Sequence, residues 1–178
     1  AGSTITVTAR DAFNNLVPGA TVVLAASGTG NTVTQPAAVT DANGVATGTL
    51  VSSVAEAKSV TATVNGTALS ANAGVTVTPG SVSASVSSIE VSPASIVAGG
   101  SAGTVTVRAR DAQGNAIAGA TVVLSATGSG NTVTQPVGVT NASGVATGSI
   151  ASTGAPETFA SWQRSQETSR RMAGQAMP

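Results

Sequence analysis

The sequence predicts an all-β protein built as two β-sandwiches in tandem. Residues 1–50 return as residues 101–150 at a constant offset of 100, and 31 of these 50 positions are identical. A unit of this length is a domain, because solenoid units run only roughly 20–50 residues. Short segments of alternating apolar and polar residues, separated by turn residues about every 8–12 positions, are typical of a sandwich.

The strands of the first unit follow from this alternation. Over residues 4–10, Ile5, Val7 and Ala9 share one face of a strand, and the polar residues between them share the other. Further strands are expected over residues 20–26, 45–51, 59–64 and 74–78. Turn signals lie at Asp11–Asn15, Asp41–Gly44 and Asn65-Gly66, and the Gly/Ser/Thr/Asn run after residue 26 is interpreted as a loop. No helix is expected before residue 154.

The second unit repeats this order, with strands expected over residues 104–110, 120–126 and 145–151. Gly114 replaces Asn14 in the first turn, which suits a backbone position with φ above zero. Residues 89–93 are expected to form an additional first strand, for which the first unit has no counterpart. Pro93 suits a strand end or an edge, because proline cannot donate to a ladder.

These assignments predict four segments. The first domain covers residues 1–78 and lacks its first strand, and a linker covers residues 79–88. The second domain covers residues 89–153 and lacks its last strands, and residues 154–178 form an aberrant tail.

The tail has two interpretations. One is an amphipathic helix over residues 156–173 with Phe159, Trp162 and Met172 as its apolar contacts. The other is the missing strands of the repeat, read in a shifted frame. In that frame the codons of Trp162-Gln163 must spell alanine, which matches Ala62, whereas Ser165-Gln166 cannot spell the asparagine expected from Asn65.

Composition excludes several functions. The formal net charge is zero and only 8% of residues are charged, which argues against binding to nucleic acid or to an anionic membrane. No apolar run approaches the roughly 20 residues of a membrane-spanning helix. No signal peptide is visible, so the chain is interpreted as a mature or internal fragment.

Histidine and cysteine are both absent, which removes the usual general base, thiol nucleophile and nitrogen or sulfur metal ligands. The sequence therefore predicts no enzyme, no cofactor, and no catalytic, cofactor-binding or metal-binding residues.

Four polar features could in principle form a metal-binding, cross-linking or ligand-binding site. Asp11, Asn14 and Asn15, or Asp111 and Asn115, could ligate calcium, but Asx turns explain them better. A cross-link from Lys58 to an asparagine would need Lys58 buried beside an acid, and an exposed Lys58 is expected instead. Arg108 and Arg110 are interpreted as a solvated strand face. Gly28–Gly30 and Gly128–Gly130 resemble a phosphate loop only superficially and are interpreted as flexible loops.

Several runs of residues, present in both copies, resemble the sequence pattern of a known domain family. The runs Val105–Asn115, Ala118–Val122 and Val139–Ala146, and their counterparts within Ile5–Ala46, resemble the bacterial Ig-like domain group 1 (invasin/intimin-type) pattern. The resemblance covers nearly all of residues 1–153. It implies immunoglobulin-like sandwiches and offers no catalytic residues.

The resemblance implies an extracellular structural or adhesion module, a stalk-like spacer of an outer-membrane-anchored bacterial surface protein. Its expected partners are neighbouring Ig-like repeats of the same chain, with any host protein or glycan bound by other domains, and neither nucleic acid nor membrane. The alternatives are a carbohydrate-binding module of a secreted enzyme and a phage virion decoration domain. A sugar-binding surface needs exposed aromatic residues, and Phe13 is the only aromatic before residue 154.

Overall fold

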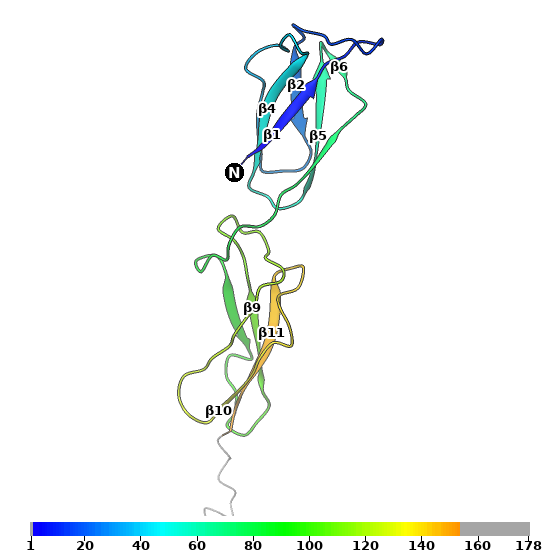
Figure 1. The fold of residues 1–178 in the computed structure, drawn as a ribbon. Coiled ribbons are helices and arrows are strands. Elements are labelled where there is room, and N and C mark those ends of the chain that lie inside the picture. Colours follow the sequence, from blue (N-terminus) through cyan, green and yellow to red (C-terminus); the bar gives the residue numbers. More distant parts are fainter. Residues whose placement is uncertain (1, 154–178) are drawn as a thin grey trace, which may run out of the picture. The chain divides into compact units, whose positions relative to one another are not determined.

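The computed structural model describes residues 2–153, which contain eleven strands and no helix (Figure 1). The predicted all-β class is confirmed. The chain divides into two compact units, one made of residues up to 82 together with 110–115, and one made of residues 83–109 together with those from 116 onward. The finer boundaries expected from the sequence stay predictions.

The first unit is a sandwich of two antiparallel sheets. Its strands are β1 (Ser3–Thr8), β2 (Val22–Ala26), β3 (Asn31–Thr34), β4 (Val45–Ser52), β5 (Ala57–Val64), β6 (Thr67–Ala68) and β7 (Ala73–Thr76). One sheet has the order β1-β4-β3. The other has the order β2-β5-β6, and β7 also pairs with β5.

The core lies between these sheets, on the faces that alternation predicts. Ile5, Val7 and Ala9 are all buried, whereas Thr6 and Thr8 are exposed. The two β1 side chains pack in one cluster with residues from both sheets, namely Val22, Leu24, Ala46, Leu50, Val60 and Ala62. Because side chains alternate across each strand, every sheet keeps one apolar face inward and one polar face in water.

The second unit repeats the first sheet and adds a strand to it. Its strands are β8 (Ser88–Ser92), β9 (Gly103–Arg108), β10 (Asn131–Thr134) and β11 (Val145–Ser152), in the order β10-β11-β9-β8. The expected additional first strand is confirmed as β8, which lies at the sheet edge and ends just before Pro93. The turns also agree with prediction, since Asn14 and Gly114 both have positive φ, at 69° and 87°.

Two sequence-based assignments are wrong. The residues interpreted as a loop after position 26 include β3, and its copy is β10. Val33 of β3 is half-buried against the core cluster, which explains why so short a segment pairs with β4.

The strand expected over residues 120–126 is not formed. In the first unit β2 pairs with β5, whose counterpart by offset is 157–164, outside the described residues. A strand needs a hydrogen-bonded neighbour, so alternation alone does not form one. Both interpretations of the tail concern residues outside the described range.

Candidate functional site

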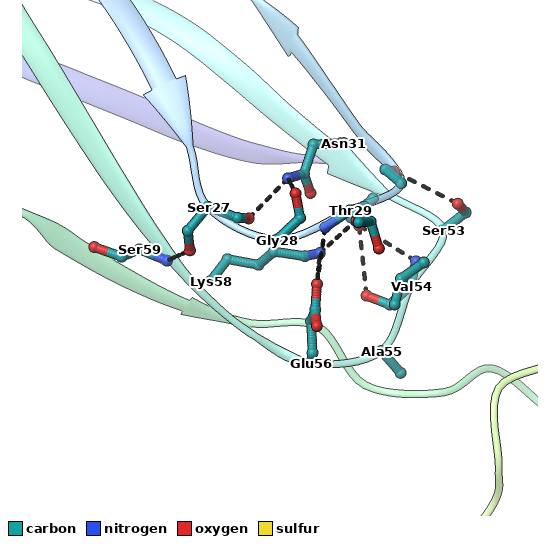
Figure 2. A network of polar contacts seen from close by, with 12 residues as sticks. Ser27, Gly28, Thr29, Asn31, Ser53, Val54, Ala55, Glu56, Lys58 and Ser59 are labelled. Atoms are coloured by element: carbon teal, nitrogen blue, oxygen red, sulfur yellow. Dashed lines mark hydrogen bonds and ion pairs between the residues drawn. The ribbon is translucent and has the colours of Figure 1, made fainter.

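Lys58 lies in a network of hydrogen bonds that joins β5 to the loop before β3 (Figure 2). The prediction that Lys58 is exposed is wrong, because only 3% of the residue is accessible. Its Nζ donates to the carbonyl oxygen of Thr29 at 2.6 Å and to Oε1 of Glu56 at 2.5 Å. Lys58 lies on the inward face of β5, two residues before the buried Val60, so register places its stem inside the sandwich.

Gly28 makes room for this ion pair. A Cβ at position 28 would lie 3.1 Å from Nζ of Lys58 and would collide with Oε1 of Glu56. The residue also has a φ of 78°, which favours glycine. The Gly-Thr-Gly run therefore serves a structural contact inside the unit.

Figure 2 shows that neighbouring residues close the same loop. Asn31 Nδ2 donates to the carbonyl oxygens of Ser27, at 2.8 Å, and Gly28, at 3.3 Å. The backbone N–H of Thr29 donates to Oε1 of Glu56 at 3.1 Å. A carboxylate of the chain itself thus takes the place that a phosphate would occupy in a phosphate-binding loop.

The ion pair lowers the pKa of Glu56. The hydrogen bond from Lys58, followed by the one from the Thr29 amide, lowers the pKa of Glu56 below its ordinary value of 4.5. Because 40% of the Glu56 side chain is accessible, water screens part of this attraction.

The loop contains the three residue types that a lysine–asparagine cross-link needs, namely a buried lysine, an acid and an asparagine. Oδ1 of Asn31 is buried and makes no hydrogen bond among the described residues. The Asn31 amide nitrogen, however, is held by two carbonyl groups. Asn131 donates in the same way to the carbonyl oxygen of Thr127, at 2.7 Å, in a unit that has no lysine. The asparagine therefore caps the loop in both copies, which accounts for its position without a cross-link.

The aspartates weighed as calcium ligands form Asx turns. Oδ1 of Asp11 accepts the backbone N–H groups of Phe13 and Asn15 at 2.9 and 2.8 Å, and Oδ2 accepts the Asn15 side chain at 2.9 Å. Asp111 repeats all three bonds with Gln113 and Asn115, at 3.0, 2.8 and 2.8 Å. Both carboxylate oxygens are thus already engaged. Within residues 2–153, no three His, Cys, Asp or Glu side chains gather as a metal site would require.

These turns hold their carboxylates ionised. The Asn15 side chain, then its backbone N–H, lowers the pKa of Asp11. The side-chain hydrogen bond from Asn115 is the largest cause that lowers the pKa of Asp111 to about 2.

The arginines belong to the same turns. Arg10 donates to the carbonyl oxygen of Asn14 at 2.9 Å, and Arg110 donates to that of Gly114 at 2.7 Å. Arg108 is exposed on the outer face of β9.

Two further side chains, Thr40 and Gln35, each bond backbone groups of a segment distant in sequence, and the sequence did not predict either role. The Thr40 hydroxyl accepts the N–H of Ala20 at 2.8 Å and donates to the carbonyl oxygen of Val17 at 2.7 Å. The Gln35 amide accepts the N–H of Leu24 at 2.7 Å and donates to its carbonyl oxygen at 2.8 Å, as a neighbouring strand would. Thr140 and Gln135 make the same bonds in the second unit. The run Asn31–Pro36, identical in both copies, was the available signal for the glutamine.

Phe13 is an aromatic residue exposed to solvent. It lies at the tip of the Asp11–Asn15 turn with 86% of the residue accessible, and its counterpart at an offset of 100 is Gln113. In the described part of the chain, no helix is long and apolar enough to cross a membrane.

The sequence profile of the bacterial Ig-like domain (group 1) family matches residues 1–78 and 86–171. No curated protein matches the chain. Among solved structures, InvD of Yersinia pseudotuberculosis is 32% identical, with a TM-score of 0.62 over 85% of this chain and 44% of that one.

Two further solved structures support the same fold. Invasin, described as a bacterial integrin-binding protein, is 24% identical with a TM-score of 0.60 over 85% of this chain and 31% of that one. FdeC, described as an Escherichia coli adhesin, is 21% identical with a TM-score of 0.53 over 86% of this chain and 51% of that one. The chain thus spans less than half the length of InvD and invasin.

Proposed function

We propose that this chain, which belongs to the bacterial Ig-like domain (group 1) family, is a stalk-like spacer of a bacterial surface protein. It is a non-enzymatic extracellular module that holds a binding domain away from the outer membrane to which the whole protein is anchored. Its partners are neighbouring Ig-like repeats of the same chain, and any host protein or glycan is bound by other domains.

One observation carries the proposal. Most of the polar side chains considered as binding or catalytic groups are instead engaged in internal bonds, and the second copy of the repeat makes most of those bonds again at an offset of 100. Asp11, Gln35 and Thr40 have both their partners and their bond lengths copied at Asp111, Gln135 and Thr140 within about 0.1 Å. A site that recognises one ligand does not require two copies of the same internal bonds, whereas a stack of modules does.

Surface labelling of the source bacterium tests the location. Antibodies raised against the purified chain should label intact cells, and protease added outside should remove the label while a cytoplasmic marker protein survives. Labelling only after lysis would contradict a surface location. Labelling of purified phage particles in place of cells would support the virion decoration domain.

A glycan-array screen of the purified chain tests the carbohydrate-binding alternative, which the exposure of Phe13 favours. The spacer proposal expects no saturable binding to any sugar class, because a single aromatic offers one stacking surface. The matched control is the Phe13→Gln variant, which gives this turn the residue found at the equivalent position 113. Saturable binding that this variant loses would overturn the spacer function for this part of the protein.

A further inference from the structure

The sequence contains two Asn-Gly pairs, and both lie in turns of the first unit. They are Asn43-Gly44 and Asn65-Gly66, and the two glycines have positive φ, at 69° and 79°. An asparagine followed by glycine can modify itself, because the glycine nitrogen can attack the side-chain carbonyl carbon with no Cβ in the way. The structure surrounds the two pairs differently.

The attacking nitrogen of the first pair is held in a tight turn. The N–H of Gly44 donates to the carbonyl oxygen of Asp41 at 2.9 Å, and the carbonyl oxygen of Gly44 accepts the N–H of Ala9 at 2.7 Å. A Cβ on Gly44 would lie 2.7 Å from the carbonyl oxygen of Ala9, so the segments are closely packed. Oδ1 of Asp41 also accepts the N–H of Asn43 at 2.8 Å. The backbone on both sides of Asn43 is therefore fixed, and its nucleophile is engaged.

The attacking nitrogen of the second pair is open. Asn65-Gly66 is the exposed two-residue turn between β5 and β6, closed by the pairing of Val64 with Thr67. Nothing lies within 4 Å of the place that a Cβ on Gly66 would take. Among the described residues, neither the N–H of Gly66 nor the side-chain nitrogen of Asn65 donates a hydrogen bond. The nucleophile and the leaving group are thus both unengaged within the described chain.

The carbonyl group of the second pair is polarised by the facing strand. The N–H of Thr21 donates to Oδ1 of Asn65 at 2.9 Å, and the carbonyl oxygen of Thr21 accepts the N–H of Asn65 at 2.9 Å. The side-chain carbonyl thus extends the ladder of β2 and β5 beyond the pair Val22–Val64. A fixed N–H at a carbonyl oxygen also stabilises the negative charge that this oxygen gains when its carbon is attacked, as in an oxyanion hole. Oδ1 of Asn43 has no such donor among the described residues.

We propose that Asn65 is a site of spontaneous modification, at which the nitrogen of Gly66 attacks Cγ of Asn65 and the N–H of Thr21 stabilises the oxyanion. The bond from this nitrogen to Cγ forms and the bond from Cγ to Nδ2 breaks. The proton of the Gly66 nitrogen passes through water to the leaving group, which departs as ammonia. Water then hydrolyses the cyclic imide at either carbonyl and leaves aspartate or isoaspartate, with no change of oxidation state. The inference goes beyond the spacer function, since it assigns the first unit a chemical modification that adds a negative charge to an exposed turn.

Peptide mapping by mass spectrometry of the freshly purified full chain, incubated at neutral pH, tests the proposal. Asn43 is the matched internal control, because it has the same dipeptide in the same unit. In the folded chain Asn65 should convert to aspartate and isoaspartate about tenfold faster than Asn43, since only Asn65 has the oxyanion donor and an unengaged nucleophile. In urea, where neither turn persists, the two asparagines should convert at similar rates.

Two variants locate the chemistry. Thr21→Pro removes the N–H that bonds Oδ1 of Asn65 and keeps the carbonyl oxygen, so it should slow conversion of Asn65 about tenfold and leave Asn43 unchanged. Gly66→Ala places a Cβ beside the attacking nitrogen and should also slow conversion of Asn65. Hydrogen exchange of the β2 amides shows whether each variant is folded, and Gly66→Ala decides the case if proline disrupts β2.

Three results would overturn the proposal. The first is conversion of Asn43 in the folded chain at the rate of Asn65 or faster. The second is conversion of Asn65 in urea alone, which would mean that the folded turn protects the asparagine. The third is conversion of Asn65 at the wild-type rate in a folded variant, either Thr21→Pro or Gly66→Ala.

Discussion

Replacing Thr40 by valine should destabilise the first unit, although valine is more apolar and has almost the same shape. Thr40 is 3% accessible and its hydroxyl is the only described side-chain link between the N–H of Ala20 and the carbonyl oxygen of Val17. Ala20 is itself 1% accessible, so its N–H has no route to water when the hydroxyl is removed.

The expected cost follows from these two bonds. A net hydrogen bond contributes about 0.5–1.5 kcal/mol, and a buried polar group left without a partner costs about 1–3 kcal/mol. We therefore expect Thr40→Val to lower the free energy of unfolding by about 2–4 kcal/mol. The matched control, Thr40→Ser, keeps both bonds and loses one methyl group, at a cost of about 1 kcal/mol.

Hydrogen exchange read by mass spectrometry under increasing urea is the suitable assay, because it reports each unit separately. Fluorescence is not suitable, since the single tryptophan lies at position 162, outside the first unit. Thr140→Val provides an internal replicate, because Thr140 is 2% accessible and bonds Ala120 and Ile117 in the same way. If Thr40→Val proves as stable as the wild type, or more stable than Thr40→Ser, then the hydroxyl bridge does not stabilise the fold and the reasoning is wrong.

Three further predictions concern the same unit. Gly48→Ala should cost about 1–3 kcal/mol by overpacking, because the new Cβ would meet the Thr34 carbonyl oxygen and Leu24 Cδ1, whereas Gly74→Ala, with nothing within 4 Å, should be near neutral in the same exchange assay. Because the pKa of Glu56 is lowered in the folded state, its contribution to stability is present above pH 4.5 and is lost as the pH falls through the folded pKa. Glu56→Gln should therefore make the free energy of unfolding less dependent on pH in this acidic range. An unchanged pH profile would contradict this. The mass of the intact protein should equal the mass calculated from the sequence, because no cross-link is expected. A mass lower by one ammonia, restored by Asn31→Ala, would show that Lys58 and Asn31 are cross-linked.

The sequence predicted those features that depend on local pattern. Alternation identified the buried face of β1, and glycine or asparagine marked turns such as those at residues 14 and 114 with positive φ. These features are predictable because strand period and backbone sterics act within a few residues.

The errors arise where a distant residue decides the outcome. β3 was interpreted as a loop because its composition matches one, yet pairing with β4 and the burial of Val33 make it a strand. Lys58 was expected in water because the second copy has no lysine, but Glu56 and the carbonyl of Thr29 accept hydrogen bonds from it inside the sandwich. The segment 120–126 alternates like β2 and forms no strand, because no counterpart of β5 is described beside it.

Comparison of the two copies separates the structural positions from the rest of the surface. Several positions whose side chains make internal bonds, among them Asp11, Gln35 and Thr40, are identical in both copies. Positions that differ include exposed ones, such as Phe13 against Gln113 and Ala37 against Val137, where Val137 is fully accessible. A ligand-binding surface shared by both units would have to be built from residues that the units share. Among the shared polar residues, Asp11, Gln35 and Thr40 are engaged in internal bonds. This favours recognition of any ligand specific to this part of the chain at a position unique to one copy. Phe13 is such a position, and the glycan screen with its Phe13→Gln control addresses it.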